Sequence, residues 1–478
     1  VGAVLQDMQE AVPYRRHSIG GAETTRPSLS GRSALCMRAA EDILSGMKVK
    51  AKAALLVNLD TDTVLYQQDA DKKIYPASIT KVMTALLVLD AVDSGKLSLD
   101  QKLTAGPSLW QGIEADTSTA DIKTGEKLTV QELLNCLLIA SAGEAANVLA
   151  VGVSGSIEAF VKDMNKKAAD IGCVGTHFTN PSGMPDADHY TTCNDIYKMA
   201  KAAMEYEEFR KIVAKPDCKI RKTNMSEERY YFSTNGLLSN MRYAGYVYSS
   251  CIGIKTGYTD DAGYCLLSAA KQNGETLVAV VMGCENPVDK SGNIKRLQFS
   301  ESSRLLQWGF DNFEEKNILD STFPAGEVKV TLSKEADYVT AVPEKTITAE
   351  LPKDIKIEDF DISTDLYEEV AAPVKKGDEL GKMTVSLGDT DYGTVKLVAA
   401  NDVSQSAWLA RKAALSNLFS KVWVRILLIV LVVCIIAVVI RVRMGGRRRR
   451  AYGGTKRRSG RGGGYRGGRG RGRLRRRR

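Results

Sequence analysis

One stretch near the C-terminus constrains the fold of this chain more than any other. Residues 426–440 (ILLIVLVVCIIAVVI) are all apolar, and extension back to Val422 across Arg425 gives about 19 residues. This is close to the length that a helix needs to cross a bilayer. The alternative is a buried helix in a soluble core, but such a helix does not need fifteen consecutive apolar residues between arginines. We expect a transmembrane helix at 422–440, with Arg425 snorkelling to the outer interface.

The residues after this helix predict its orientation. Residues 441–478 contain eighteen Lys or Arg and no Asp or Glu, and cationic flanks stay on the cytoplasmic side. A single-pass protein of the cell membrane with its body outside the cytoplasm is therefore expected. Because the whole chain carries +9, the part before the tail carries −9 and does not indicate nucleic-acid binding. The Arg/Gly-rich tail is expected to be a solvated topogenic segment, and binding to anionic lipid or RNA is the alternative.

The chain before the membrane segment is long enough for two folded units. Residues 1–50 have little periodicity and are expected to be poorly ordered; they contain no apolar run of signal-peptide length, so the true N-terminus stays open. Residues 51–315 follow the order strand, helices, strands, helix, which predicts an α/β or α+β domain. Residues 318–400 contain short alternating strands, which predict a small all-β domain, and 401–421 are expected to form a helical connector.

The expected elements can be placed from their hydrophobic periods and turn residues. In the first domain we expect strands at 53–59, 63–68, 252–257, 263–272 and 276–284, and helices at 78–92, 130–149, 157–169 and 302–313. Asn273-Gly274 is a strong two-residue hairpin turn between two of these strands. In the second domain we expect strands at 327–332, 338–342, 346–351, 381–387 and 393–400.

Cysteine and histidine usage narrows the possible chemistry. The nine cysteines form no Cys-x-x-Cys pair, which argues against a zinc site or a disulfide framework, and the odd number leaves at least one thiol free. The only histidines are His17, His177 and His189, so a histidine base has few candidates. A packed or hydrogen-bonded role is favoured over metal ligation for His177 and His189. No metal and no cofactor are expected.

Three short motifs occur in a fixed order along the first domain. They are Ser78-Ile79-Thr80-Lys81, Ser141-Ala142-Gly143 and Lys255-Thr256-Gly257. Each motif alone is weak, because Ser-x-x-Lys also begins at Ser45 and Ser268, and Lys-Thr-Gly also begins at Lys123. Only the pair at 78 and 81 opens a strongly amphipathic helix, which puts the two side chains on one face. Lys255 ends a predicted strand, whereas Lys123 lies in a polar loop.

These residue types together indicate nucleophilic catalysis without histidine. A serine hydroxyl needs an adjacent base, and a neutral lysine can serve as one. Lys81 is expected to be neutral because of burial and the second cation Lys255. The backbone amides of Ser78 and Tyr258 could stabilise an oxyanion, and Ser141 could relay a proton to the leaving amine.

The combination is the Ser-x-x-Lys, Ser-x-Asn, Lys-Thr-Gly set of penicillin-binding proteins and serine β-lactamases. Longer segments extend the match. The segments ALLVNLDTDTVLYQQDADKKIYPASITKVMTALLVLD, HFTNPSGMPDADHYTT and GIKTGYTDDAGYCLLSAA resemble the D-alanyl-D-alanine carboxypeptidases, which are low-molecular-mass penicillin-binding proteins of peptidase family S11. The resemblance covers about residues 50–315, and 318–400 is similar to the C-terminal domain of that family.

The resemblance implies a fold, a reaction and a set of site residues. The implied fold is the penicillin-recognising serine DD-peptidase/β-lactamase-like α/β (α+β) fold, with a five-stranded antiparallel sheet packed against helices. The implied reaction removes the terminal D-alanine of peptidoglycan stem peptides through an acyl-enzyme, in cell-wall biogenesis, with β-lactams as inhibitors. Ser78, Lys81 and Ser141 would be catalytic. Substrate binding would fall to Lys255, Thr256, Gly257 and Tyr258, with Asn235, which lies in the motif-like segment STNGLL.

Two departures from the family pattern leave alternatives open. Gly143 stands where the middle motif has Asn, whose side chain would contact Lys81 and the substrate amide; Asn147, one turn further, is a candidate substitute. A catalytically impaired protein that binds peptidoglycan or β-lactams is therefore an alternative to the enzyme. A β-lactamase is disfavoured, because we identify no carboxylate to activate a deacylating water. The apparent spanning helix also replaces the amphipathic anchor helix that is usual in this family.

Overall fold

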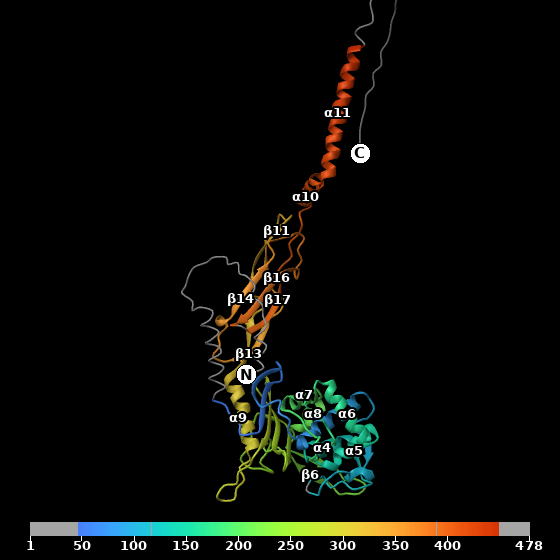
Figure 1. Cartoon of the computed structure of the whole chain (residues 1–478), viewed down its shortest axis with the longest axis vertical. Helices are drawn as coiled ribbons and strands as arrows, with labels where there is room; N and C mark the ends of the chain where they lie inside the picture. The colour runs from blue at the N-terminus through green and yellow to red at the C-terminus, as the bar shows by residue number, and fades with distance from the viewer. Residues whose placement is uncertain (1–45, 116, 389, 449–478) are drawn as a thin grey trace, which may run out of the picture. The chain divides into compact units, whose positions relative to one another are not determined.

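The computed structural model describes residues 46–115, 117–388 and 390–448. The expectations for residues 1–45 and for the tail from 449 onward lie outside this range. The described residues form two compact units. The first extends to residue 327 and also contains 340–367 and 379–400, and the second contains 328–339, 368–378 and the residues from 401 onward. Figure 1 shows the order of the elements along the chain.

The first unit is built on a five-stranded antiparallel sheet. Its strand order is β2-β1-β9-β8-β7. The strands are β1 (Ala53–Asn58), β2 (Thr63–Gln68), β7 (Cys251–Thr259), β8 (Gly263–Gln272) and β9 (Glu275–Cys284). The turn between β8 and β9 contains Asn273 and Gly274, both with positive φ, as an Asn-Gly hairpin turn requires. The five strands expected from the sequence are thus all present.

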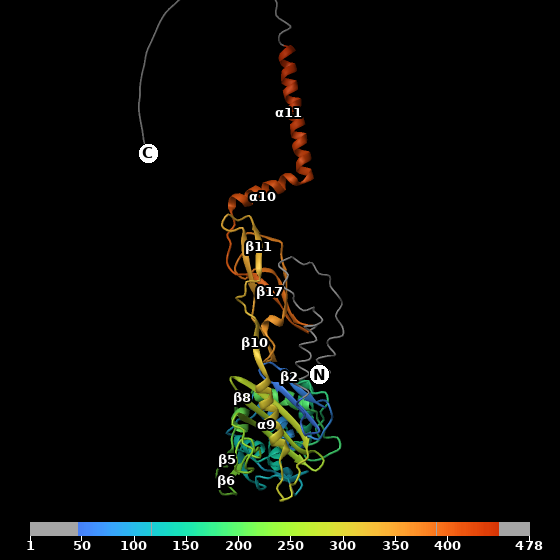
Figure 2. The same cartoon turned by 90° about the vertical axis from the view of Figure 1, so that its left-hand side faces the viewer.

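Both faces of this sheet are covered, which explains why β1 is buried along its whole length. Leu55 and Val57 belong to the core that packs against the helical lobe, whereas Ala54 and Leu56 belong to a second core with Leu305 of α9 (Leu297–Asn312). The alternation follows from the two-residue period of a strand. Figure 2 shows α9 lying across the sheet beside β8. The helix begins five residues earlier than predicted from the sequence and ends at 312, where strand β10 begins.

The helical lobe contains the elements that carry the first two motifs. The predicted helix at 78–92 is a short 3-10 turn, η1 (Ala77–Thr80), followed by α3 (Lys81–Asp93). The predicted helix at 130–149 is two helices, α4 (Val130–Leu138) and α5 (Gly143–Ser154). The prediction of one helix is wrong because Ser141 has a φ of +63°, a left-handed conformation that a right-handed helix cannot contain. The apolar pattern runs on through this break and hides it.

The remaining elements of the lobe complete its core. They are α6 (Ile157–Asp170), α7 (Cys193–Met204), α8 (Glu207–Val213), the 3-10 turn η2 (Pro107–Trp110), the pair β3 (Lys102–Thr104) and β4 (Lys127–Thr129), and the pair β5 (Asp217–Ile220) and β6 (Arg229–Phe232). Capping side chains fix several helix starts; Thr129 and Glu132 form a reciprocal capping box at α4. The described cysteines are all free thiols, and all except Cys251 and Cys434 are buried.

The residues after α9 are rich in strands, as the sequence predicts. Strand β10 (Phe313–Leu319) pairs with β13 (Ile347–Pro352), and β14 (Asp361–Leu366), β16 (Glu379–Leu387), β17 (Thr390–Ala399) and β12 (Tyr338–Pro343) lie side by side in that order. Within the second unit, β11 (Gly326–Thr331) pairs in parallel with β15 (Glu369–Ala371). A 3-10 turn, η3, covers Ile357–Asp359.

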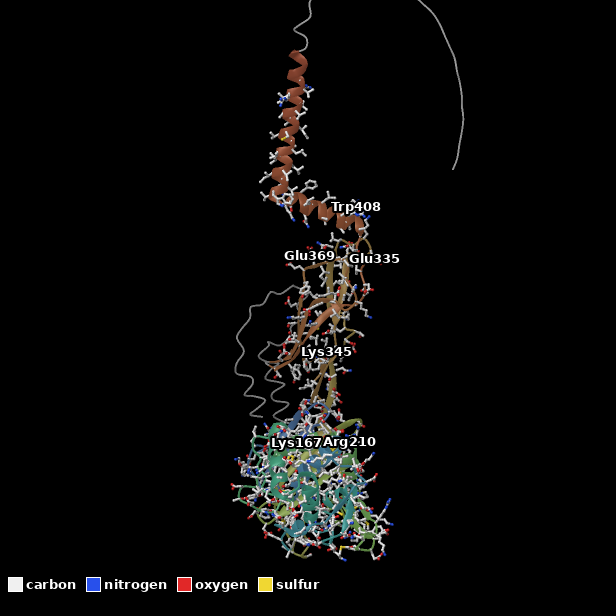
Figure 3. The ribbon with its side chains drawn as sticks, turned by 90° about the vertical axis from the view of Figure 1, so that its right-hand side faces the viewer. Lys167, Arg210, Glu335, Lys345, Glu369 and Trp408 are labelled. Carbon is white, nitrogen blue, oxygen red and sulfur yellow. The ribbon has the colours of Figure 1, made fainter. Side chains whose placement is uncertain are left out.

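Two helices end the described chain. The connector predicted at 401–421 contains α10 (Ala407–Ser420), which is followed by α11 (Val422–Arg448). Residues 422–443 of α11 are long and apolar enough to cross a membrane, and none of their most apolar window is buried in the protein. Figure 3 shows the side chains of α11 projecting from the ribbon on all sides, with Trp408 labelled on the neighbouring α10.

Candidate active site

Ser78 and Lys81 lie together at the junction of η1 and α3. The Nζ atom of Lys81 is 2.8 Å from Oγ of Ser78, and it also donates a hydrogen bond of 2.5 Å to the carbonyl oxygen of Ser182. Lys81 is completely buried, whereas Ser78 is partly exposed. An accessible hydroxyl is therefore held against a desolvated amine, the arrangement that an activated serine requires.

Burial governs the charge state of Lys81. It lowers the pKa of Lys81 to about 7, and the negative charge of Glu144 opposes this effect by favouring the charged form. The sequence-based expectation gave Lys255 a share in lowering this pKa, but Lys255 is not among its causes. The pKa of Lys255 is itself lowered, first by burial and then by the positive charges of Lys81 and Arg242.

The second and third motifs meet at Lys255. Its Nζ atom donates to Oγ of Ser141 at 2.9 Å and to the carbonyl oxygen of Thr256 at 2.9 Å. Thr256 Oγ1 lies 2.5 Å from Oγ1 of Thr234. The left-handed backbone of Ser141 places its side chain toward β7 instead of continuing α4. The structure thus joins the second and third motifs, and the charge of Lys81 acting on Lys255 places the first motif beside them.

Gly257 explains how β7 approaches Ser78. A Cβ atom at this position would lie 2.9 Å from the carbonyl oxygen of Pro76 and 3.3 Å from the amide nitrogen of Ser78. Only a glycine lets the strand pass this close to the η1 turn. The strand position after Gly257 is Tyr258, whose ring is half exposed and whose hydroxyl donates to Asp260 at 2.8 Å. The side chain of Tyr258 also packs against the ring of Tyr264.

Asn235 and its neighbour Thr234 differ in what they contact. Asn235 is buried; its side-chain oxygen accepts a hydrogen bond from the amide of Leu237, and its side-chain nitrogen is 3.9 Å from Sγ of Cys251. It holds its own loop, while Thr234 makes the contact with Thr256. Our sequence analysis named Asn235 and missed Thr234, although both lie in the same quoted segment.

Models of known families match two parts of the chain. Residues 38–286 match the family described as D-alanyl-D-alanine carboxypeptidase, and residues 313–405 match the C-terminal domain of penicillin-binding protein 5. The first match covers more than half of the chain. The chain belongs to the D-alanyl-D-alanine carboxypeptidases of peptidase family S11. The predicted family, fold class and enzyme class, a serine-type carboxypeptidase, are confirmed.

Individual members of the family are similar over most of the chain. D-alanyl-D-alanine carboxypeptidase DacF of Bacillus subtilis is 29% identical over 360 residues, which are 75% of this chain and 87% of that protein. A D-alanyl-D-alanine carboxypeptidase of Streptomyces sp. strain K15 is 32% identical and covers 55% of this chain and 88% of its own length. Among solved structures, penicillin binding protein 5 from Haemophilus influenzae has a TM-score of 0.58 at 27% identity and covers 75% of this chain and 99% of that one.

The family's middle motif differs here, and Asn147 does not replace the absent Asn. The side-chain nitrogen of Asn147 donates to the carbonyl oxygens of Ser108, Leu109 and Gln111 at 3.2, 3.0 and 2.9 Å. The donors of this side-chain amide are therefore used by the segment that follows β3. The sequence-based alternative of Asn147 as a substitute is therefore wrong.

The two histidines in the described part of the chain, His177 and His189, both form hydrogen bonds. Nε2 of His189 is 2.8 Å from Oγ1 of Thr80, and its Nδ1 accepts from the amide of Thr179 at 3.1 Å. Burial lowers the pKa of His189 to about 4, so the ring is neutral near pH 7. Within the described residues, no group of three or more His, Cys, Asp or Glu side chains is arranged to hold a metal ion.

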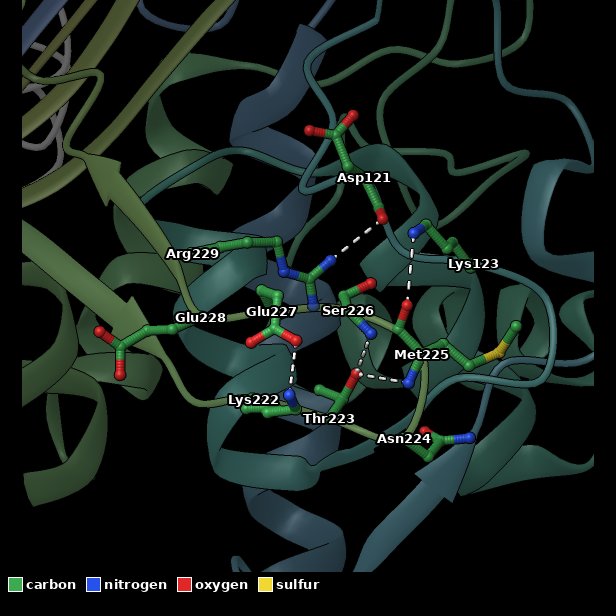
Figure 4. A pocket seen from close by; sticks show the side chains of 10 residues that line it. All are labelled: Asp121, Lys123, Lys222, Thr223, Asn224, Met225, Ser226, Glu227, Glu228 and Arg229. Carbon is green, nitrogen blue, oxygen red and sulfur yellow. Dashed lines mark hydrogen bonds and ion pairs between the residues drawn. The ribbon is translucent and has the colours of Figure 1, made fainter.

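A charged hollow lies elsewhere on the same unit. Figure 4 shows its lining residues, which are Asp121, Lys123 and 222–229. Lys222 forms an ion pair of 2.5 Å with Glu227, and Nζ of Lys123 donates to the carbonyl oxygen of Met225 at 3.3 Å. None of the predicted site residues lines this hollow, which is therefore separate from the Ser78 site.

Proposed function

We propose that Ser78 is the nucleophile of a D-alanyl-D-alanine carboxypeptidase and that Lys81 is its base. The observation that carries the proposal is the 2.8 Å contact between the two side chains, with Lys81 fully buried and its pKa near 7. A base with a pKa near the working pH is unprotonated in a substantial fraction of the molecules and is still basic enough to accept a proton. The substrate would be the stem peptide of peptidoglycan.

The reaction proceeds through an acyl-enzyme. Oγ of Ser78 attacks the carbonyl carbon of the penultimate D-alanine as its proton moves to Lys81, and the amides of Ser78 and Tyr258 stabilise the oxyanion. Ser141 then relays this proton from Lys81 to the nitrogen of the terminal D-alanine, which leaves as the C–N bond breaks, and Lys81 is neutral again. Water, deprotonated by Lys81, attacks the Ser78 ester, and Lys81 returns the proton to Oγ of Ser78 as the shortened peptide leaves. A β-lactam carbonyl would enter the same first step and leave a stable ester.

Lys255, Thr256 and Thr234 would recognise the free carboxylate at the end of the substrate. The lowered pKa of Lys255 does not oppose this role, because an incoming carboxylate favours the ammonium form and replaces the water that burial removed. The two threonine hydroxyls, 2.5 Å apart, can both donate once the carboxylate is present. A substrate that lacks the free carboxylate would leave Lys255 unpaired, which is the basis for expecting carboxypeptidase rather than endopeptidase activity.

The test uses the full chain in detergent with a fluorescent penicillin, intact-mass analysis and a D-alanine release assay. We expect one penicilloyl adduct and D-alanine release, and loss of both in Ser78→Ala. Ser268→Ala is a matched control, because Ser268 also begins a Ser-x-x-Lys sequence but is buried in β8. Labelling without release would favour the impaired binding protein. The absence of labelling in folded protein would refute the assignment of Ser78.

The setting of the enzyme is also a proposal. We infer that α11 crosses the membrane once, that residues before 422 lie outside the cytoplasm, and that the basic tail contacts anionic lipid at most weakly. The apolar length of residues 422–443 supports the span. We further propose that residues 51–315 and 318–400 are separate domains, as the two family matches suggest. Protease protection of the tail in sealed vesicles would test the orientation.

A further inference from the structure

Gly143, the departure from the family motif, is packed against a neighbouring segment. A Cβ atom at Gly143 would lie 2.8 Å from Cγ2 of Thr117 and 3.1 Å from Cδ1 of Ile113. Real Cβ atoms essentially never show the 2.8 Å contact and rarely the 3.1 Å one, so a side chain at 143 would require the side chain of Thr117 to shift and that of Ile113 to move slightly. Its φ does not lie in the left-handed region, so the backbone would accept any residue. Space, and not backbone conformation, therefore selects glycine at this position.

The contacting segment is fixed along one face of α5. We call residues 108–115 and 117–120 the strap. The amide of Gly143 donates to the carbonyl oxygen of Ser118 at 2.9 Å, and Glu144 accepts from Thr119 Oγ1 and from the amide of Ala120, both at 2.6 Å. One turn further along α5, Asn147 binds three strap carbonyls. These three residues of α5 thus hold the strap at both ends.

The strap also reaches the loop that positions the base. Oγ1 of Thr117 donates to Sδ of Met184 at 3.2 Å. Met184 belongs to a turn organised by Asn180, whose side-chain oxygen accepts from the amides of Ser182 and Met184 at 3.2 and 3.0 Å. The carbonyl oxygen of Ser182 accepts from Nζ of Lys81. Thr117 therefore links α5 to the turn that holds Lys81.

We propose that the strap, through Ile113 and Thr117, occupies the space of the absent motif side chain and positions Lys81 in its place. This proposal rests on the proposed function, because it assigns Thr117 as a positioning residue for that reaction. Gly143 and the strap are then complementary in shape, and the glycine does not impair the site. The opposite hypothesis is that Gly143 lowers the rate of acylation and that Asn at this position would raise it.

A four-variant cycle separates the two hypotheses. Gly143→Asn is made in the native chain and in a chain with Thr117→Ser and Ile113→Val, which remove Cγ2 and Cδ1 and keep the hydroxyl that contacts Met184. The rate of penicillin acylation is measured against pH, with the melting temperature of each full-length protein. Gly106→Ala is the matched control, since nothing lies within 4 Å of a Cβ atom there.

We expect Gly143→Asn alone to lower the acylation rate about 10- to 100-fold, as small misplacements of catalytic groups do. The apparent pKa of its pH profile should also move, because Lys81 is displaced; a purely structural change would leave that pKa in place. Adding Thr117→Ser and Ile113→Val to Gly143→Asn should restore most of the acylation rate. An unchanged or higher rate in Gly143→Asn alone, or no recovery in the strap background, would overturn the proposal.

If the proposed function is wrong, the experiment gives a different result from failure of the strap proposal. If the native chain is folded but not acylated, Ser78 is not the nucleophile and the rate comparison has no baseline. The melting temperatures still decide whether the strap and Gly143 are a matched pair: a drop in Gly143→Asn that the strap variants reverse supports the packing, and additive effects contradict it.

Discussion

The Ser78 site and helix α11 both reverse the ordinary distribution of side chains, one by burying charge and the other by exposing apolar surface. Lys81 and Lys255 are 0% and 1% exposed, while Leu427 and Val433 are 59% and 57% exposed. Burying a lysine takes its charge out of water, and exposing a leucine puts apolar surface into water. Both changes raise the free energy of the folded protein. At the first site the protein compensates with a lowered pKa and hydrogen bonds. At the second, the proposed bilayer would compensate.

This comparison shows that exposure alone distinguishes two functional regions of opposite chemistry. The two lysines are shielded from water because the sheet and helices pack closely around them. The apolar side chains of α11 are exposed because no described residue covers them. Each region can be tested by a single substitution. The consequences should differ: removing the buried charge should affect catalysis, whereas adding a charge to α11 should affect location.

The largest effect is expected for Lys81→Met. Acylation should fall about 10²- to 10⁴-fold, the usual contribution of a general base. Stability should not fall in parallel. The unfolded lysine binds a proton below its ordinary pKa of 10.5 and the folded one only below about 7, so native stability rises with pH between these values. The rise should be smaller in the variant, in which only the buried Lys255 still contributes to it, and thermal unfolding from pH 7 to 10 would detect the difference.

Lys102→Met is the control for that experiment, because Lys102 is exposed in β3. It should retain both the acylation rate and the pH dependence of stability. A Lys81→Met protein that is still acylated at the native rate would show that the buried Lys81 is not the base.

The next effect concerns α11. Val433→Arg places a charge near the middle of the apolar stretch, which costs about 2.5–3.5 kcal/mol for a helix in a bilayer. The fraction of protein that resists extraction from membranes at alkaline pH should fall strongly. Val433→Leu should behave as the native chain. Equal retention of the arginine and leucine variants would show that α11 does not span a membrane.

A smaller effect is expected for Glu144→Gln. The negative charge of Glu144 favours the charged form of Lys81, so its removal should lower the pKa of Lys81 further. The acylation rate of the native chain should rise with pH through about 7 and then level off, as the base loses its proton. In the variant this rise should occur at lower pH. A shift toward higher pH would mean that another group controls the profile.

The smallest effect is expected from a stop after Gln405, which removes α10, α11 and the tail. The rate of D-alanine release from a soluble pentapeptide should stay within about twofold of the native value, because every proposed site residue precedes residue 260 and distant surface changes have small effects. The truncated protein should appear in the soluble fraction. A large loss of activity on the soluble peptide would show that the two regions are not independent.

The sequence was most informative where local signals are strong. Alternation and an Asn-Gly turn located the five strands of the main sheet, and the apolar run located α11. The motif order predicted that Ser78, Ser141 and Lys255 would meet, and the structure places them together. Spacing within a motif and the period of an element are both encoded by neighbouring residues, so they can be recognised without a structure.

Long-range packing was not predictable in this way. The break before α5 depends on the left-handed backbone of Ser141, which the continuing apolar pattern conceals. Glu144 and Thr234 affect Lys81 and Thr256 across 63 and 22 residues of sequence, and no local pattern connects them. Gly143 is crowded by a methyl group on Thr117, a contact that only the folded chain creates.

The buried cysteines have a consequence for how this protein must be made. Burial raises the pKa of seven described thiols, Cys136, Cys173, Cys193, Cys218, Cys251, Cys265 and Cys284, so that little thiolate forms at neutral pH. The thiolate is the form that oxidants attack. A chain that folds promptly is therefore protected from mispairing, whereas one that stays unfolded in an oxidising compartment presents all of these thiols at once. On the topology proposed above, the speed of folding would set the yield of intact enzyme.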